Sequence, residues 1–202
     1  IENSEIIYQR DLPNYNAAIA AYLVDGVIDV ERDYNALLIE LMERGIIIKE
    51  NNEYVVKDLN KCLLLHTETE KYVASNLNKK VNKREFKKAV LQDVKNLNLI
   101  TMGDIPVFGV ILVLLFFNQF YLIVLVIVYF KTALLQELIY KLTPEGGKEK
   151  DKMLKLKAFL HDFSKIENVE KLEHNIWERY LPFAIALDEN DNFLKKNESE
   201  GI

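Results

Sequence analysis

The sequence lacks the paired cysteines, the basic surplus and the leader peptide that mark several common protein classes. Cys62 is the only cysteine among 202 residues, so no disulfide can form within the chain and its soluble parts need no oxidising compartment. The net charge is −5, whereas a phosphate backbone requires a basic surface, so nucleic acid is not expected as the main partner. The chain starts at Ile1 without a signal-peptide pattern, and we expect either a fragment of a longer protein or a processed product, with any extracytoplasmic domain upstream.

Charged residues are also missing from Ile105–Phe130, which contains no Asp, Glu, Lys, Arg or His. Hydrophobic residues make up 50% of the whole chain and charged residues 28%, an average that hides this segment. As one straight helix the segment would be roughly 39 Å long, more than the ~30 Å hydrocarbon core of a bilayer requires. We predict that it lies in a membrane, because its side chains favour lipid and its backbone groups can be satisfied internally.

The polar pair Asn118-Gln119 interrupts the apolar segment near its middle. In a single span this pair would lie close to the bilayer centre, which is costly, whereas in a hairpin it would form the turn. Lysines flank the segment on both sides, so the positive-inside rule favours both ends in the cytoplasm. We favour a membrane hairpin over a single span, and both over a helical hairpin buried in a soluble core. Because each arm is short, the hairpin either draws polar residues beyond the segment into the bilayer or re-enters on the same side as a shallow hairpin.

The first 60 residues follow the element order of a winged helix. Apolar spacing predicts one helix that ends at Gly26 and a second that ends at Gly45, and Ile46–Val56 is typical of a β-hairpin. Residues 1–60 hold 12 acidic and 5 basic side chains, which would repel a phosphate backbone. We therefore predict a winged-helix-like protein-interaction module, with DNA binding by its second helix as the weaker alternative.

Residues 61–104 are predicted to form a helical, basic juxtamembrane region. One helical stretch runs from Asp58 to Leu77. A second runs from Asn82 to Leu97 and is amphipathic, with an apolar face on one side and a basic face on the other. A basic amphipathic helix before an apolar segment fits contact with anionic lipid headgroups, and an ordinary solvated face explains it as well. The apolar side of the first stretch comprises Leu59, Cys62, Leu63, His66, Tyr72 and Val73. The candidate headgroup contacts are Lys83, Arg84, Lys87 and Lys88.

Residues 131–187 are predicted to form a C-terminal helical region, and 188–202 a disordered tail. Thr143-Pro144 is a good helix start, which Gly146-Gly147 should break before a charged helix follows. Pro182 should kink or end the last helix. That helix carries a candidate interaction patch, in which aromatic side chains share a face beside an arginine. Packing in the core of a helical domain explains the same three-residue spacing of the aromatic side chains, and we favour that explanation. The patch comprises Trp177, Arg179, Tyr180 and Phe183.

No catalytic, cofactor-binding or metal site is predicted, and we do not expect an enzyme. His161, Asp162 and Ser164 crowd one helix and point in different directions, unlike a hydrolase triad. His66 and Glu68 are spaced by two on a helix and share no face that could hold a metal.

Three motifs near the C-terminal end of the chain carry a family resemblance. They are Leu142–Gly146, Leu156–Ser164 and Ile176–Leu187, and they resemble the C-terminal region of the YciQ-like predicted membrane proteins, a family of unknown function. The resemblance extends from Leu12-Pro13 to Leu187 and departs at Asp188, where the family continues with another apolar segment. It implies a cytoplasmic region that follows an extracytoplasmic domain and a membrane helix. It brings no catalytic residues.

Together these features predict a mainly α-helical membrane protein with cytoplasmic soluble flanks. Its expected role is a non-enzymatic interaction or assembly module, with the lipid bilayer and either other subunits or a second copy as partners. The alternative is a membrane-tethered regulator whose winged helix binds nucleic acid.

Overall fold

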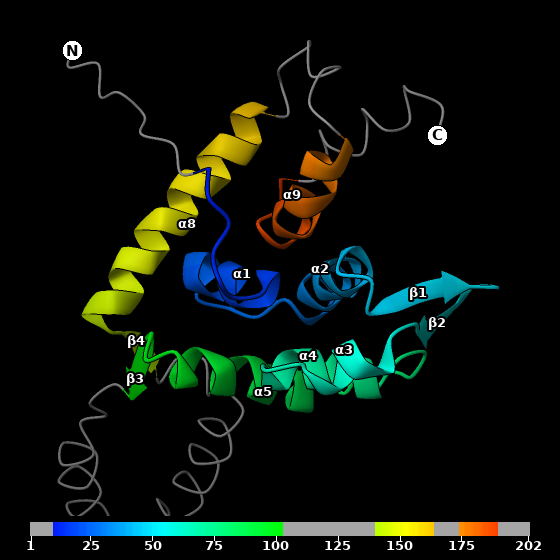
Figure 1. The fold of residues 1–202 in the computed structure, drawn as a ribbon. Coiled ribbons are helices and arrows are strands. Elements are labelled where there is room, and N and C mark those ends of the chain that lie inside the picture. Colours follow the sequence, from blue (N-terminus) through cyan, green and yellow to red (C-terminus); the bar gives the residue numbers. More distant parts are fainter. Residues whose placement is uncertain (1–9, 103–139, 164–173, 190–202) are drawn as a thin grey trace, which may run out of the picture.

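The computed structural model describes residues 10–102, 140–163 and 174–189 (Figure 1). Within these ranges the chain is mainly α-helical, as predicted, with two short pairs of antiparallel strands. None of the helices described is both long and apolar enough to cross a membrane. The predicted membrane segment Ile105–Phe130 lies outside the described residues, as does the predicted tail beyond Glu189.

A first unit has the predicted order of helix, helix and β-hairpin, followed by one more short helix. Its first two helices begin at side-chain caps, since the carbonyl of the Asn16 side chain accepts from Ile19 N–H and the Asp29 carboxylate accepts from two N–H groups of the next helix. Gly26, at φ 72°, ends the first helix. The elements are α1 (Ala17–Asp25), α2 (Val30–Glu43), β1 (Ile47–Glu50), β2 (Glu53–Val56) and α3 (Leu59–Leu63).

A second unit repeats this order. Its first helix starts with a capping box, in which the Thr67 hydroxyl and the Glu70 carboxylate each accept from the other residue's backbone N–H. Its second helix begins at Lys83, one residue after the predicted start at Asn82, which caps it. The elements are α4 (Glu68–Ser75), α5 (Lys83–Asn96), β3 (Ile100–Met102), β4 (Tyr140–Leu142) and α8 (Pro144–Phe163), and α9 (His174–Ala186) follows.

The two units share their local geometry at a spacing of 53 residues. α2 and α5 each contain 14 residues, and their caps Asp29 and Asn82 accept from the second and third N–H groups of the helix. Two residues past each helix the backbone turns left-handed, with φ 67° at Gly45 and 56° at Asn98. A strand begins two residues later in both units. The two units therefore share the order helix, helix and hairpin and, from α2 and α5 onward, the same spacing, although their sequences differ.

The segment between β3 and β4 takes the position that a short turn has in the first unit. In the first unit Asn51 and Asn52, at φ 49° and 67°, form the two-residue turn that joins β1 to β2. In the second unit residues 103–139 join β3 to β4 instead. The predicted membrane segment is thus part of the connection inside a β-hairpin.

α2 lies at the centre of the fold. It contacts α1, α4, α5 and α9, and in Figure 1 α1 and α2 form a middle layer between α8 and α9 on one side and α4 and α5 on the other. Leu37 and Leu41 of α2 are fully buried, and Phe86 of α5 is buried against the rings of Tyr34 and Tyr72. One cluster of buried residues connects both units with α8 and α9.

The predicted helix from Asp58 to Leu77 is wrong in its continuity and in its apolar side. The structure has two helices, because Thr67 and Glu70 form a capping box that starts α4 anew. Leu59 and Leu63 are 67% and 75% exposed, since α3 lies at the edge of the molecule and not over its core. His66 is exposed as well, whereas Val73 is buried as expected.

The predicted break at Gly146-Gly147 is also wrong, and of the kink or end predicted at Pro182 the end is wrong. Gly146 and Gly147 lie inside α8, which begins at Pro144 as expected and continues to Phe163. The Thr143 hydroxyl accepts from Gly146 N–H at 3.0 Å and so caps this helix. α9 continues through Pro182 to Ala186, because a proline removes only one hydrogen bond and the buried Phe183, Ala184 and Ala186 hold this turn against the core.

Candidate functional site

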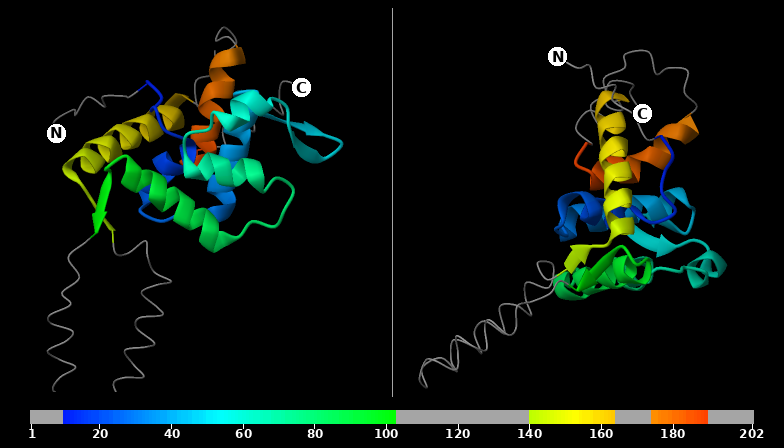
Figure 2. Two further views of the ribbon diagram at one scale, coloured as in Figure 1. Left: turned by 60° about the horizontal axis from the view of Figure 1, so that its bottom comes forward. Right: turned by 90° about the vertical axis from the view of Figure 1, so that its left-hand side faces the viewer.

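The β3–β4 pair forms the root of the segment 103–139. The strands run antiparallel, with Ile100 opposite Leu142 and Met102 opposite Tyr140. Directly opposed residues in such a pair have Cα atoms about 4.5–5.5 Å apart. The chain therefore leaves the described fold and returns to it at neighbouring positions (Figure 2).

Hydrogen bonds and close packing hold the root against the start of α8. Thr143 donates its N–H to the carbonyl oxygen of Leu99 at 3.0 Å and its hydroxyl to that of Asn98 at 2.7 Å. Gly146 packs directly on the same backbone, since a Cβ there would overlap the Leu99 carbonyl oxygen and lie 2.9 Å from its carbon. The Lys95 ammonium lies 4.3 Å from the centre of the Tyr140 ring. These contacts fix the two strands to both α5 and α8.

α5 carries the predicted basic face. Lys83, Arg84 and Lys88 are exposed and Lys87 is half-buried, while Phe86 and Val90 on the other side are fully buried. In the left view of Figure 2, α5 forms the lower edge of the helical part, the side on which the β3–β4 root also lies. The four candidate headgroup residues therefore share one face in the first half of α5, at the opposite end of this helix from the root.

An acid on the second helix of each unit, half-buried Glu40 and buried Asp93, caps the first helix of that unit. Glu40 accepts from Ala17 N–H at 2.9 Å, at the start of α1. Asp93, 53 residues later, accepts from the N–H groups of Glu68 and Thr69, each at 2.8 Å, and from the Thr69 hydroxyl, at the start of α4. An acid at a helix N-terminus also interacts favourably with the helix dipole. These carboxylates thus have structural partners.

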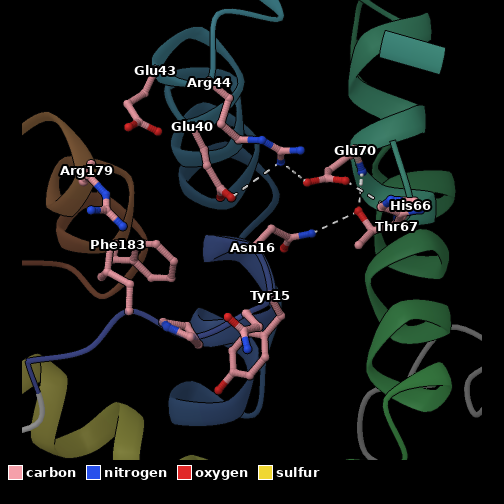
Figure 3. A pocket seen from close by; sticks show the side chains of 13 residues that line it. Tyr15, Asn16, Glu40, Glu43, Arg44, His66, Thr67, Glu70, Arg179 and Phe183 are labelled. Carbon is pink, nitrogen blue, oxygen red and sulfur yellow. Dashed lines mark hydrogen bonds and ion pairs between the residues drawn. The ribbon is translucent and has the colours of Figure 1, made fainter. Parts of the chain in front are cut away.

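A polar pocket of about 330 Å³ lies between α2, α9 and the residues that precede α1 and α4 (Figure 3). Arg44 bridges two acids across it, with an ion pair to Glu70 and a 4.0 Å contact to Glu40. The Asn16 amide donates to the Thr67 hydroxyl at 3.2 Å. The pocket therefore lies where the two units are joined by polar contacts.

Burial controls the electrostatics near this junction. It raises the pKa of Glu40 to about 7, with a smaller increase from Glu70, while the hydrogen bond from Ala17 N–H and the charge of Arg44 lower it. The pKa of Asp33 is also raised to about 7, by burial, against the lowering effect of Arg32. Both carboxyls therefore change charge near neutral pH.

The four residues of the predicted interaction patch do not share one environment. The Trp177 side chain lies outside the described residues. Arg179 is exposed and lines the polar pocket beside Phe183, which is only 5% exposed (Figure 3). Tyr180 donates its hydroxyl to the carbonyl oxygen of Arg10 at 2.7 Å, and its ring packs on Phe159 with the centres 5.7 Å apart. Tyr180 and Phe183 thus serve packing, and Arg179 is the exposed residue that lines the pocket together with Phe183.

Two histidines among the residues considered for catalysis or metal binding have acidic neighbours in the structure. His161 Nδ1 lies 2.8 Å from a carboxylate oxygen of Glu189, and Ser164 is outside the described residues. His66 lines the polar pocket, where Glu70 already pairs with Arg44. In the part of the chain that the structure describes, no three His, Cys, Asp or Glu side chains are grouped as metal ligands.

Comparison with known proteins identifies the family. The model of the family described as "Predicted membrane protein (DUF2207) C-terminal domain" matches residues 66–196, more than half of the chain. The chain belongs to this family. No curated protein and no solved structure matches it. The DUF2207 C-terminal match covers the second unit, the segment 103–139, α8 and α9, and it identifies the chain as part of a predicted membrane protein of unknown function.

The match begins later than the sequence resemblance did, at residue 66 and not at Leu12-Pro13. The first unit therefore lies outside the matched range, and its relation to the second rests on the shared geometry. Sequence reasoning missed this repeat because the capping residues differ between the units: Asp29 and Asn82 at one position, Gly45 and Asn98 at another. The equal lengths of α2 and α5 would have been the signal to look for.

Proposed function

We propose that this chain is the cytoplasmic and membrane-embedded part of a membrane protein, a YciQ-like protein as its motifs suggest, and acts as a non-enzymatic assembly module. In this proposal the apolar segment enters the bilayer as a hairpin, and both helix–helix–hairpin units stay on the cytoplasmic side. The basic face of α5 then rests on anionic headgroups. Contacts with other subunits or a second copy complete the assembly.

The observation that carries the proposal is the pairing of Met102 with Tyr140. A single span of ~30 Å would separate the two ends of the segment by the thickness of the hydrocarbon core, whereas a two-stranded pair requires them side by side. A segment with both ends at one point crosses an even number of times or re-enters on the same side. This supports the hairpin over the single span.

Charge distribution supports the proposed orientation. Residues 67–102 contain eight basic and four acidic side chains, and two of the acids, Glu70 and Asp93, are buried. The first unit, in contrast, is acidic. Anionic lipids therefore attract the second unit more strongly than the first, and the apolar segment emerges from this second unit. Positive residues beside a membrane segment are typical of the cytoplasmic side.

An interaction role, as opposed to catalysis, is supported by how the polar groups are used. The acids Glu40 and Asp93 cap helices, and Arg44 joins the two units. At the same time Leu59 and Leu63 of α3 are largely exposed, as in a surface that another protein covers.

The nucleic-acid alternative has less support. A winged helix reads DNA with the outward face of its second helix. Here α2 is central, and from Tyr34 to Leu41 every residue except Asn35 is buried or half-buried. A low-salt gel shift tests this alternative directly, because tight and steeply salt-dependent binding would favour it.

Cysteine labelling in intact cells tests the proposed topology. The background is Cys62→Ser, and single cysteines replace the exposed Lys88 before the segment and the exposed Leu154 after it. We expect a membrane-impermeant maleimide to label neither position until the inner membrane is permeabilised. Labelling of only one of the two in intact cells would establish a single span and refute the hairpin.

A further inference from the structure

A cavity of about 440 Å³ lies between α2, β2 and the loop 76–83, at the N-terminal end of α5. Its floor is apolar: Val30, Tyr34 and Leu38, spaced by four on α2, are each no more than 8% exposed overall. Its rim carries several lysines and one acid, Glu31. The lysines are Lys79, Lys80 and Lys83. The cavity therefore combines an apolar floor with a rim of net positive charge.

The loop that closes this cavity is fixed on both sides. The Asn78 side chain donates to the Tyr54 carbonyl oxygen and accepts from Tyr54 N–H, both at 2.8 Å, as a neighbouring strand would. The Tyr34 hydroxyl donates to the Asn76 carbonyl oxygen at 3.4 Å. Because these bonds hold the loop against β2 and α2, the lysines on it are positioned before any ligand arrives.

Two of the three lysines have their charge available. Lys79 donates to the Ser75 carbonyl oxygen at 3.1 Å. Among the described residues, no ion pair or hydrogen bond occupies the ammonium groups of Lys80 and Lys83. A phosphate between these two would gain two charge-assisted contacts.

We propose that this cavity binds one anionic phospholipid. Lys80 and Lys83 contact its phosphate, and Val30 and Leu38 contact the glycerol and the first carbons of the chains. The inference rests on the proposed function, since it requires α5 to lie at the headgroups. In the left view of Figure 2 α5 lies along the lower edge of the helical part; the β3–β4 root follows its C-terminal end and the cavity lies at its N-terminal end. A polyanion such as nucleic acid fits less well, because it would leave the apolar floor uncovered.

Native mass spectrometry of the full chain, released from a nonionic detergent, tests this site. The probes are phosphatidylglycerol, phosphatidylcholine with the same chains, and inorganic phosphate. The test variant is Lys80→Gln/Lys83→Gln. The matched control is Arg84→Gln/Lys88→Gln, which removes the same charge from exposed positions of α5 outside the cavity.

We expect one bound phosphatidylglycerol per chain, retained in preference to phosphatidylcholine and not displaced by inorganic phosphate. Lys80→Gln/Lys83→Gln should weaken it roughly tenfold, and the control pair by less than about threefold. Equal loss in both variants would mean diffuse attraction and overturn the site, as would displacement by phosphate or no preference for the anionic lipid. This measurement is made in micelles and does not depend on the topology in the membrane. Lipid binding can therefore fail while labelling at positions 88 and 154 supports the hairpin, and labelling can contradict the hairpin while the lipid still binds.

Discussion

Gly146→Ala should weaken the attachment between α8 and the root of the segment 103–139. A Cβ at this position would overlap the carbonyl oxygen of Leu99, which is backbone and has no rotamer to change. The first turn of α8 must therefore move away. Gly147 is the matched control, because a Cβ there meets nothing within 4 Å although the residue lies in the same helical turn.

The size of the effect follows from the contacts that such a movement breaks. Thr143 makes two hydrogen bonds across this contact, to Leu99 and Asn98, each contributing about 0.5–1.5 kcal/mol. Overpacking adds about 1–3 kcal/mol, and the better helix propensity of alanine returns about 1 kcal/mol. We expect Gly146→Ala to lower the free energy of unfolding by about 2–4 kcal/mol. Gly147→Ala should raise it by about 0.5–1 kcal/mol.

Denaturant unfolding in a nonionic detergent, followed by circular dichroism, measures both variants. The midpoint should fall for Gly146→Ala and rise slightly for Gly147→Ala at an unchanged slope. A Gly146→Ala midpoint equal to or above that of the unaltered chain would refute the close contact between α8 and Leu99, and with it the position of the root.

Three further predictions concern the polar contacts. Asp93→Ala removes the acceptor of three hydrogen bonds at the start of α4 and should cost about 3–5 kcal/mol in the free energy of unfolding; a loss below about 1 kcal/mol would contradict this role. Burial raises the pKa of Glu40 above its unfolded value, so this group's contribution to stability is complete at low pH and is lost as pH rises through about 7. Glu40→Gln should therefore stabilise the chain by about 1–3 kcal/mol at pH 8 but not at pH 5, unlike Glu43→Gln at an exposed position, and equal melting shifts at both pH values would argue against it. Asn78→Ala removes both bonds to Tyr54 and should speed amide hydrogen exchange in β2, whereas unchanged exchange would mean that the loop is not fixed there.

Local signals in the sequence predicted most elements of the fold. Apolar residues at helical spacing predicted the helices that the structure shows as α2 and α5, which Asp29 and Asn82 cap. The predicted breaks failed where tertiary packing overrides local preference. Gly146 is in a helix because only glycine fits against Leu99, and Pro182 continues α9 because its turn is buried against the core.

The candidate site was only partly predictable. The basic face of α5 followed from periodicity, because charges and apolar residues alternate there at helical spacing. The polar pocket and the phospholipid cavity did not, since each joins residues far apart in the chain, such as Arg44 with Glu70 or Tyr54 with Asn78. In the candidate interaction patch around Trp177, the sequence pattern was present but ambiguous, because the same spacing fits both a binding surface and a core. The contacts of Tyr180 and the burial of Phe183 identify packing at those two positions.

A disulfide between the two strands of the root in native membranes tests whether the apolar segment leaves and returns at one place. Thr101 and Lys141 are directly opposed across β3 and β4, and both are exposed. In a Cys62→Ser background, mild oxidation of Thr101→Cys/Lys141→Cys should form an intrachain disulfide almost completely, while Thr101→Cys/Leu154→Cys should not. If residues 101 and 141 lay on opposite sides of the membrane, no oxidant would join them, and the hairpin would be wrong.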